Sequence, residues 1–395
     1  MYTPKTLVPL LLLCLLLPIT PVSLEASSSF KVAGWLPYWQ DTSGIKSATK
    51  HMRDLDTLHP FVLEVQPDGT IKDRADLNES QWRRLLRDAK RRDVEIIPTI
   101  TWFDGHLIHL FLSDKERRKE HIQAIVEMVD DGNFDGVDID YESKLAITSQ
   151  YFSLFLEELK EALGSDLLTC TVEARTPPSS LYREIPETLA YANDYTAMNE
   201  YCDRIELMTY DQQRADLLLN SSAIGEPYIP VADPAWVEKV IELALEDFDH
   251  DKIMLGVATY GRIWKLEVTP NQYRTYTNSK AINLPEAEAL EKKYDITPRR
   301  NSAGELSFAY FPEDSFYKIF DRLPTPQNTP KGYEAAAKAL LVANAFKIPI
   351  PVNIAWYSDA QAIEDKIDLI EKHNLRGVAI FKIDGEEDPD VWDLF

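Results

Sequence analysis

The 395-residue sequence predicts a (β/α)8 TIM barrel with a small α+β insertion between its seventh and eighth strands. Eight short runs rich in β-forming residues recur along the chain, and segments with apolar residues at helical spacing separate most of them. This alternation is typical of a parallel barrel surrounded by helices. The competing doubly wound sheet rarely needs eight such units and usually has a glycine-rich first turn, which "AGWLPYW" lacks.

Each predicted strand has a core of aliphatic, aromatic or β-branched residues. The predicted strands are residues 30–36, 60–65, 94–102, 134–142, 167–175, 204–210, 252–261 and 376–383. The predicted barrel helices include residues 78–92, with Asn78 as a candidate cap, and 114–129, 149–163, 234–248 and 359–373. The chain ends at Phe395, which leaves almost nothing for an eighth helix.

The gap between the seventh and eighth predicted strands is too long for one helix. Residues 265–357 contain three short strand-like runs and a helical segment, and we expect them to form the α+β insertion. The barrel then comprises residues 30–264 and 358–395. We expect the insertion to wall one side of the substrate cleft, with Trp264 or Trp356 near the groove.

The formal net charge of −23 disfavours nucleic acid and anionic membranes as partners, so a neutral substrate is the simpler expectation. The alternative, which is equally open, is that the negative charge only keeps the protein soluble and indicates nothing about its partners. Residues 1–26 combine Lys5, a long apolar run and small residues near Ala26, which predicts a secretory signal peptide. An uncleaved membrane anchor is the second possibility. We therefore expect a secreted, extracellular or cell-envelope protein, and a monomer.

Two cysteines remain after the predicted signal, Cys170 and Cys202. The sequence has no CxxC pattern and no Cys/His cluster, so it gives no support for a zinc site, and no cofactor is expected. An exported chain permits a disulfide between the two cysteines. Two buried free thiols are the slightly favoured interpretation.

The stretch "FDGVDIDYES" at residues 134–143 contains the most informative pattern. Side chains alternate along a strand, so Asp138, Asp140 and Glu142 share one face, and the apolar residues between them share the other. In a barrel the apolar face packs on the helices, so the acids point inward. Glu142 lies at the strand's C-terminal end, where barrel active sites form. Burying carboxylates without partners is costly, which indicates a functional use.

Three neighbouring acids cannot all ionise easily, so at least one pKa is raised. Glu142, the outermost, is best placed to keep a proton near neutral pH and to act as a general acid on a glycosidic oxygen. Asp140 can hydrogen-bond either neighbour. A calcium loop is disfavoured because apolar residues separate the acids and the required glycine is missing. A solvated edge strand is disfavoured by Phe134 and the other apolar residues of the run.

Four motifs resemble those of family 18 glycoside hydrolases, the chitinase-type barrels. "DGVDIDYE" resembles the DxxDxDxE signature, "LMTYD" at 207–211 is similar to MxYD, and "YGRIW" at 260–264 is similar to YGRxW. "YSDAQAIEDK" resembles the start of the YDDxxSxxxK helix, and "GWLPYW" lies where the family has first-strand aromatics. The resemblance covers residues 30–395 in the family's order. It implies the barrel, the insertion and a sugar substrate.

The resemblance also implies roles for single residues. Glu142 would be the acid/base, and Asp140 its partner that also contacts the substrate's acetamido N–H. Asp138 would support Asp140, and Tyr210 would donate to the acetamido oxygen. The implied substrate-binding residues are Trp35, Tyr38, Trp102, Met208, Asp211, Arg262 and Phe381. Plain core packing for Met208 and a structural ion pair for Arg262 remain alternatives.

Two departures point to one branch of the family. The third strand ends in "TITWF" (99–103) where the family usually has SxGG, and the eighth offers Phe381 where it usually has a tryptophan. Both resemble the bacterial cell-wall branch, related to spore-cortex glucosaminidases. The implied function is a secreted, retaining, substrate-assisted hydrolase of β-linked N-acetylglucosamine in peptidoglycan or a chitin-like glycan. The alternative, a non-catalytic chitinase-like lectin, is disfavoured because Glu142 is present.

Overall fold

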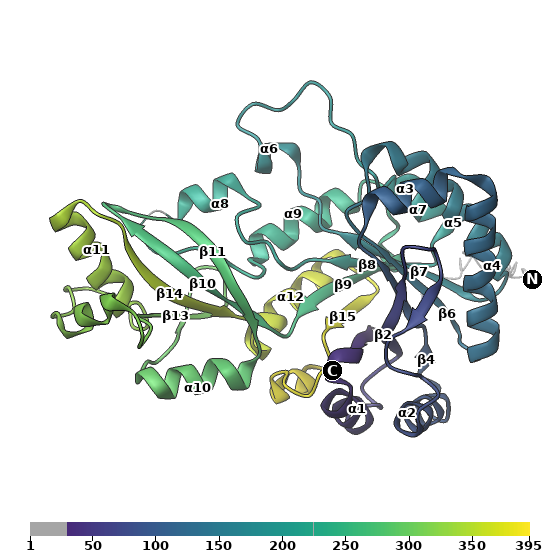
Figure 1. Ribbon diagram of the computed structural model, residues 1–395, viewed down its shortest axis with the longest axis horizontal. Coiled ribbons are helices and arrows are strands. Elements are labelled where there is room, and N and C mark those ends of the chain that lie inside the picture. Colours follow the sequence, from purple (N-terminus) through teal and green to yellow (C-terminus); the bar gives the residue numbers. More distant parts are fainter. Residues whose placement is uncertain (1–29, 224) are drawn as a thin grey trace, which may run out of the picture.

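Eight parallel strands close into a barrel in the computed structural model, which describes residues 30–223 and 225–395 (Figure 1). They are β1 (Lys31–Pro37), β2 (Thr57–Val65), β5 (Thr99–Trp102), β6 (Gly136–Tyr141), β7 (Leu167–Glu173), β8 (Arg204–Met208), β9 (Ile253–Ala258) and β15 (Gly377–Phe381). Their order is β1-β15-β9-β8-β7-β6-β5-β2, and pairing of β1 with β2 closes the ring. The predicted (β/α)8 barrel is confirmed. The predicted signal peptide, residues 1–26, lies outside the described residues.

Helices cover the outside of the barrel. They are α1 (Asp41–Lys50), α2 (Ser80–Lys90), α3 (Gly105–Ser113), α4 (Lys115–Gly132), α5 (Ser149–Leu163), α7 (Tyr195–Tyr201), α9 (Pro234–Ala244) and α12 (Ala360–His373). Two short helices, α6 (Pro178–Leu181) and α8 (Leu217–Ser222), lie in the loops that follow β7 and β8 (Figure 1). Helix α4 begins where expected, because the Asp114 carboxylate accepts the backbone N–H groups of Glu116 and Arg117. Helix α2 is preceded by Glu79, so Asn78 is not its cap. A short 3-10 helix, Pro389–Leu394, ends the chain.

The two faces of the barrel strands carry different residues. Outward-facing side chains such as Val137, Ile139 and Tyr141 join the apolar core beneath the helices. Inward-facing positions are largely polar and buried. They include Thr57, His59, Thr99, Asp138, Thr169, Thr171, Arg204 and Glu206. This polar interior supports the site at the C-terminal mouth of the barrel.

The insertion is a five-stranded antiparallel sheet with its own core, to the left of the barrel in Figure 1. Its strands, in the order β11-β10-β14-β13-β12, are β11 (Gln272–Ile282), β10 (Gly261–Thr269), β14 (Ile350–Tyr357), β13 (Leu306–Tyr310) and β12 (Arg299–Arg300). Its helices are α10 (Leu284–Tyr294) and α11 (Glu334–Phe346). The sheet begins at Gly261 rather than at residue 265, because β10 follows β9 almost directly.

Two tryptophans expected near the groove lie elsewhere. Trp264 and Trp356 are buried in the insertion's own apolar core and do not line the cleft. Trp356 donates its indole N–H to Glu305 instead. The expectation that either residue faces the groove is therefore wrong.

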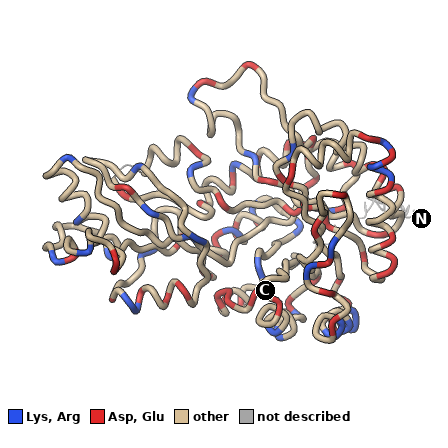
Figure 2. The backbone as a smooth tube through the Cα atoms, in the orientation of Figure 1, with Lys and Arg blue, Asp and Glu red and all other residues tan. Residues whose placement is uncertain are grey.

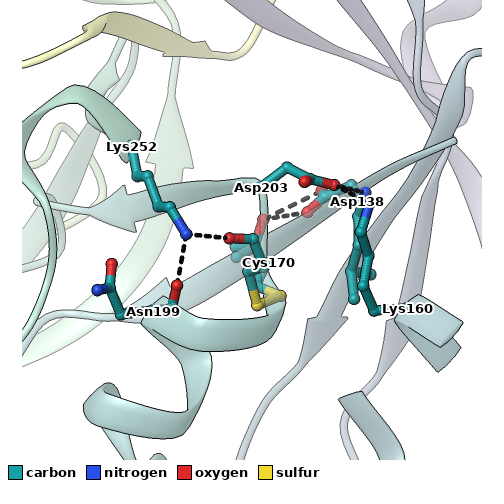
Figure 3. The surroundings of a disulfide bond; sticks show 9 residues. Asp138, Lys160, Cys170, Asn199, Asp203 and Lys252 are labelled. Carbon is teal, nitrogen blue, oxygen red and sulfur yellow. Dashed lines mark hydrogen bonds and ion pairs between the residues drawn. A yellow bond between two sulfur atoms is a disulfide. The ribbon is translucent and has the colours of Figure 1, made fainter. Parts of the chain in front are cut away.

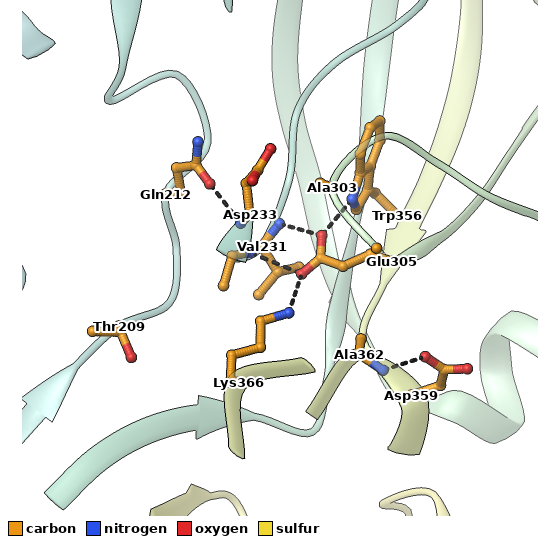
Figure 4. Close-up of polar contacts among 12 residues, drawn as sticks. Thr209, Gln212, Val231, Asp233, Ala303, Glu305, Trp356, Asp359, Ala362 and Lys366 are labelled. Carbon is orange, nitrogen blue, oxygen red and sulfur yellow. Dashed lines mark hydrogen bonds and ion pairs between the residues drawn. The ribbon is translucent and has the colours of Figure 1, made fainter. Parts of the chain in front are cut away.

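A buried ion pair joins the insertion to the barrel (Figure 4). Glu305 accepts the backbone N–H groups of Val231 and Ala232, at 2.9 and 2.8 Å. Lys366 of α12 places its Nζ 4.0 Å from the Glu305 carboxylate, and both side chains are buried. Lys366 is the lysine of the "YSDAQAIEDK" motif. This contact explains why a charged residue occupies the inner face of an otherwise amphipathic helix.

Cys170 and Cys202 form a disulfide (Figure 3), so the expectation of two free thiols is wrong. Cys170 is on the outward face of β7, and Cys202 directly follows α7. Lys252 donates to the Cys202 carbonyl nearby, at 3.1 Å. The pairing depends on how α7 packs against the barrel, which the spacing of two cysteines does not reveal.

Charge is spread widely over the described chain. Figure 2 shows acidic and basic residues interspersed along both the barrel and the insertion. Helix α2 carries a basic cluster that includes Arg83, Arg84 and Arg87. No helix in the described part of the chain combines the length and apolar character needed to cross a membrane.

Candidate active site

Asp138 lies deepest among the three acids of β6. Its side chain is fully buried, and three side chains donate hydrogen bonds to it. The donors are the indole N–H of Trp35 (3.3 Å) and the hydroxyls of Thr99 (2.8 Å) and Thr171 (2.9 Å). Burial raises the pKa of Asp138 to about 6. The three donors favour the anion, so Asp138 is mostly ionised at neutral pH.

Asp140 lies between Asp138 and Glu142 on the same inward face. It is 3% exposed, and within residues 30–223 and 225–395 its Oδ1 atom has no hydrogen-bond partner. Burial, together with the charges of Glu142 and Asp138, raises its pKa well above the ordinary value. The raised pKa favours the protonated form of Asp140, which can donate a hydrogen bond to a neighbouring carboxylate.

Glu142 follows the end of β6 at the mouth of the barrel. Its backbone N–H donates to the Trp102 carbonyl at 2.9 Å, which continues the pairing with β5 and holds the residue in place. Burial raises the pKa of its carboxyl to about 7, and the charges of Glu173 and Asp211 add to this, while Lys144 opposes it. A carboxyl with this pKa can give up a proton and take one back near neutral pH.

Glu173 is a site residue that the sequence interpretation missed. It ends β7, and its carboxylate accepts the backbone N–H of Ser143 (3.1 Å) and the amide of Asn193 (2.8 Å). It lines the same cleft as Glu142. A signal for it exists in the sequence, because Thr171 and Glu173 alternate along the predicted strand, which places Glu173 inward at the strand's C-terminal end.

Tyr210 and Phe381 form the aromatic side of the site. Their rings stack with centroids 5.6 Å apart and an interplanar angle of 19°. Burial keeps the pKa of Tyr210 well above its ordinary value, so its phenol stays neutral and can donate a hydrogen bond. Met208, at the end of β8, lines the same wall.

Asp211 and Arg262 join the barrel to the insertion at the cleft. The Arg262 guanidinium donates two hydrogen bonds to the Asp211 carboxylate, at 2.7 and 2.5 Å. Asp211 has a φ of 56°, in the left-handed region, which aspartate tolerates better than most residues. A bidentate pair of this kind fixes both side chains. Arg262 is thus a structural ion-pair residue and a cleft residue at once.

The site opens into a cleft of about 560 Å³ at the C-terminal end of the barrel. Its lining residues are Trp35, Trp39, Phe61, Phe103, Asp140, Glu142, Thr171, Glu173, Ala174, Met208, Tyr210, Asp211, Tyr260, Arg262, Ala281, Phe381 and Lys382. The lining combines acidic groups with aromatic rings, of which those of Trp39 and Phe103 are exposed. Rings flanking acids suit a sugar, because its C–H face packs on an aromatic ring while its hydroxyls need polar partners.

Two predicted sugar-site residues lie elsewhere. Trp102 pairs in register with Tyr141, so it faces the helices, and its ring packs against those of Tyr141 and Phe111. The next residue, Phe103, is 52% exposed and lines the cleft in its place. Tyr38 lies under the guanidinium of Arg74.

Trp39 takes the position in the cleft that was expected of Tyr38. It is 48% exposed and lines the cleft beside Phe61, with which its ring makes an edge contact at 5.7 Å. In each case the sequence interpretation was wrong by one residue. Each error comes from the local register of the chain where a strand ends.

Comparisons with known proteins agree with this geometry. The chain is 19% identical over 360 residues to "Uncharacterized glycosylase YvbX" of Bacillus subtilis (strain 168), covering 89% of this chain and 87% of that one. It is 21% identical to the "Cortical fragment-lytic enzyme" of Bacillus anthracis, covering 85% of this chain but 66% of that relative, just under two thirds of its length.

A solved structure shares the fold. The spore cortex-lytic enzyme SleL of Bacillus cereus superposes with a TM-score of 0.67 and 21% identity, over 92% of this chain and 73% of that one. The sequence profile of the family described as "Glycosyl hydrolases family 18" matches residues 35–386, which include the whole barrel site and the insertion. The chain therefore belongs to the family 18 glycosyl hydrolases.

Proposed function

We propose that this glycosidase cleaves β-linked N-acetylglucosamine glycans by retaining, substrate-assisted catalysis, with Glu142 as the acid/base. The observation that carries the proposal is Glu142 at the mouth of the barrel, two residues beyond the buried Asp140, with a pKa that burial raises to about 7. A general acid needs a proton near its working pH and access to the leaving oxygen. Glu142 lines the open cleft and meets both requirements.

The other carboxylates of the cleft are poorly placed to act as a nucleophile. Asp211 is held by the two hydrogen bonds from Arg262. Both oxygens of Glu173 accept hydrogen bonds, from Ser143 and Asn193. Asp140 is buried, and burial raises its pKa well above the ordinary value, which disfavours the anion that a nucleophile needs. These contacts support a mechanism in which the substrate supplies its own nucleophile, as substrate-assisted glycosidases do.

In the proposed reaction the 2-acetamido oxygen of the bound sugar attacks the anomeric carbon. Glu142 protonates the glycosidic oxygen as the glycosidic bond breaks, and a cyclic oxazolinium forms. Tyr210 donates its phenol O–H to the acetamido oxygen. Asp140 donates its own proton toward Glu142, and its other oxygen accepts the acetamido N–H.

Ionised Glu142 then takes a proton from a water molecule, which attacks the anomeric carbon and reopens the ring. Because attack occurs from the face that the leaving group occupied, the β configuration is retained. The proposed polymer substrate is a peptidoglycan or a chitin-like glycan. The relatives named cortical fragment-lytic enzymes support this choice. The net charge of −23 also favours a substrate that carries no large negative charge. The apolar N-terminal segment supports export to the cell envelope or beyond, with a membrane link only through that segment.

The test uses defined oligomers. NMR of the first-formed product should show the β anomer, and N-deacetylated oligomers should not be cut. Mass spectrometry of products from peptidoglycan and from chitin oligomers identifies the glycan. An α product, or equal cleavage of deacetylated oligomers, contradicts the mechanism. Binding of oligomers without any cleavage would support the lectin alternative instead.

A further inference from the structure

A buried histidine–glutamate pair lies inside the barrel, close to Asp138 of β6. His59 of β2 and Glu206 of β8 are 0% and 1% exposed. The Nε2 atom of His59 is 3.3 Å from Oε1 of Glu206. The proposed mechanism uses neither residue. Two ionisable groups sealed in a barrel are costly to bury, and a bare structural role would be filled more easily by apolar residues.

The contacts of the two ring nitrogens favour a positive charge on His59. Its Nδ1 atom is 2.9 Å from the Ile97 carbonyl, which only accepts, so Nδ1 carries a hydrogen. Its Nε2 atom lies 3.3 Å from Oε1 of Glu206, and within the described residues neither this nitrogen nor either Glu206 oxygen makes a hydrogen bond. A second proton, on Nε2, would place a cation directly against the buried Glu206 side chain.

The charges around His59 also favour its protonated form. Burial alone lowers the pKa of His59, but its contact with Glu206 and the charge of Asp138 outweigh burial and leave the pKa raised. Glu206 from β8 and Asp138 from β6 are the charged groups that face the imidazole. Arg204, two residues before Glu206 on β8, donates a hydrogen bond to Glu95 at 2.6 Å. The negative charges of Glu95 and Glu206 also act on the nearby guanidinium of Arg376.

Trp35 connects this pair to the acids above. The rings of His59 and Trp35 stack with centroids 5.5 Å apart, and the indole N–H of Trp35 donates to Asp138. A cation close to Asp138 favours its anion. The three side chains that hydrogen-bond Asp138 donate to it, so none of these contacts requires Asp138 to carry a proton.

We propose that His59, held as a cation by Glu206, is a positioning residue that keeps Asp138 ionised, so that the single proton of the inner aspartates resides on Asp140. His59 does not change the number of protons that Asp138 and Asp140 hold together. It determines which of the two aspartates carries the proton. Asp140 then has a proton to donate toward Glu142 when substrate binds. The link to catalysis rests on the proposed function, whereas the charge of His59 does not.

The first experiment measures that charge without any substrate. The folded protein is labelled with ¹⁵N-histidine, and the ring nitrogens of its seven histidines are followed by NMR from pH 4 to 9. His59 should stay doubly protonated at pH 7 and above. His121 is the opposite internal control, because burial lowers its pKa to about 4. A neutral His59 ring at pH 7 would overturn the proposal.

Signal assignment uses His59→Gln, in which one resonance disappears. Where that variant does not fold, single His→Gln variants of the other six positions assign His59 by elimination. The charge measurement therefore remains decisive whether or not the substituted barrel is stable, and whether or not the enzyme acts on the glycan named above.

The second experiment measures the acid limb of kcat/KM with a chromogenic N-acetylglucosamine oligomer. The double variant H59Q/E206Q removes both charges and leaves no unpaired buried carboxylate. Because His59 lowers the pKa of Asp138 more than Glu206 raises it, the acid limb should move upward by about one pH unit, and kcat should fall more than KM changes. His250→Gln, at an exposed position, is the matched control and should leave the limb in place. A uniformly lower activity with an unmoved limb would show that the pair is only structural.

Discussion

Replacing Glu173 with glutamine should shift the alkaline limb of the enzyme's pH profile to lower pH. Burial raises the pKa of Glu142 to about 7, and the negative charge of Glu173 is the next largest cause. Glutamine keeps the size of the side chain and one acceptor oxygen for Ser143, but removes that charge. Glu142 then loses its proton more easily, so the acid form needed for bond cleavage disappears at a lower pH.

The structure bounds the size of this shift. A neighbouring charge typically moves a pKa by about 1–3 units, and the Glu173 side chain is 37% exposed, so screening by water favours the low end. A pKa about one unit lower reduces the protonated fraction of Glu142 about tenfold at pH 8 and hardly changes it at pH 5. We therefore expect kcat/KM to fall about tenfold at pH 8 and to stay near the wild-type value at pH 5.

The assay is kcat/KM for a chromogenic N-acetylglucosamine oligomer between pH 4.5 and 9. Glu161→Gln, on the exposed side of α5, removes one carboxylate far from the cleft and controls for net charge. An alkaline limb that stays in place in E173Q, or moves to higher pH, would refute the assignment of Glu173 as a residue that raises the pKa of Glu142. An equal loss at every pH would point to lost geometry instead.

Three further outcomes are expected. E142Q should lose about 10²–10⁴-fold in kcat while calorimetry still detects oligomer binding, since positioned acid catalysis has that value; lost binding would indicate a folding defect. Removing the disulfide with C170A/C202A should lower the free energy of unfolding by about 3–4 kcal/mol in denaturant titrations, because the bond closes a loop with a sequence separation of 32, and an unchanged midpoint would contradict this. Lys366→Met should destabilise by about 3–5 kcal/mol by leaving Glu305 buried without its cation, and Lys366→Met combined with Glu305→Gln should recover part of that loss in thermal unfolding.

The barrel was predictable because its pattern is repeated. Each of the eight strands has its own apolar run, and an error in one would not have changed the fold class. The inward position of Asp138, Asp140 and Glu142 was predictable for a related reason. Strand alternation fixes the facing of the whole set once the apolar partners Val137 and Ile139 are assigned to the helix side.

Features that depend on contacts between distant segments were not predictable. Strand alternation could have placed Glu173 in the cleft, but its hydrogen bond to Ser143 depends on the register between β6 and β7 and on the turn after β6. The last paired residue of β5 decides whether Trp102 or Phe103 lines the cleft. A strand-like run in the sequence does not define the end of a strand to within one residue. The disulfide and the Glu305–Lys366 pair likewise depend on how a helix packs against another unit. No local pattern reports such packing.

The position of Arg262 has a consequence for protein engineering. The residue lies on β10, the first strand of the insertion, yet its guanidinium holds Asp211, which follows barrel strand β8. A chimera that exchanges the whole insertion, in order to alter the length of glycan accepted, would therefore also remove a wall of the cleft. Crossover points placed after Ile263 and before Trp356 would retain Arg262 and its neighbour across the β10–β14 ladder. The segment between them can be exchanged as a cassette provided that the replacement also supplies the Glu305 carboxylate, which pairs with Lys366 of α12 and accepts the backbone N–H groups of Val231 and Ala232.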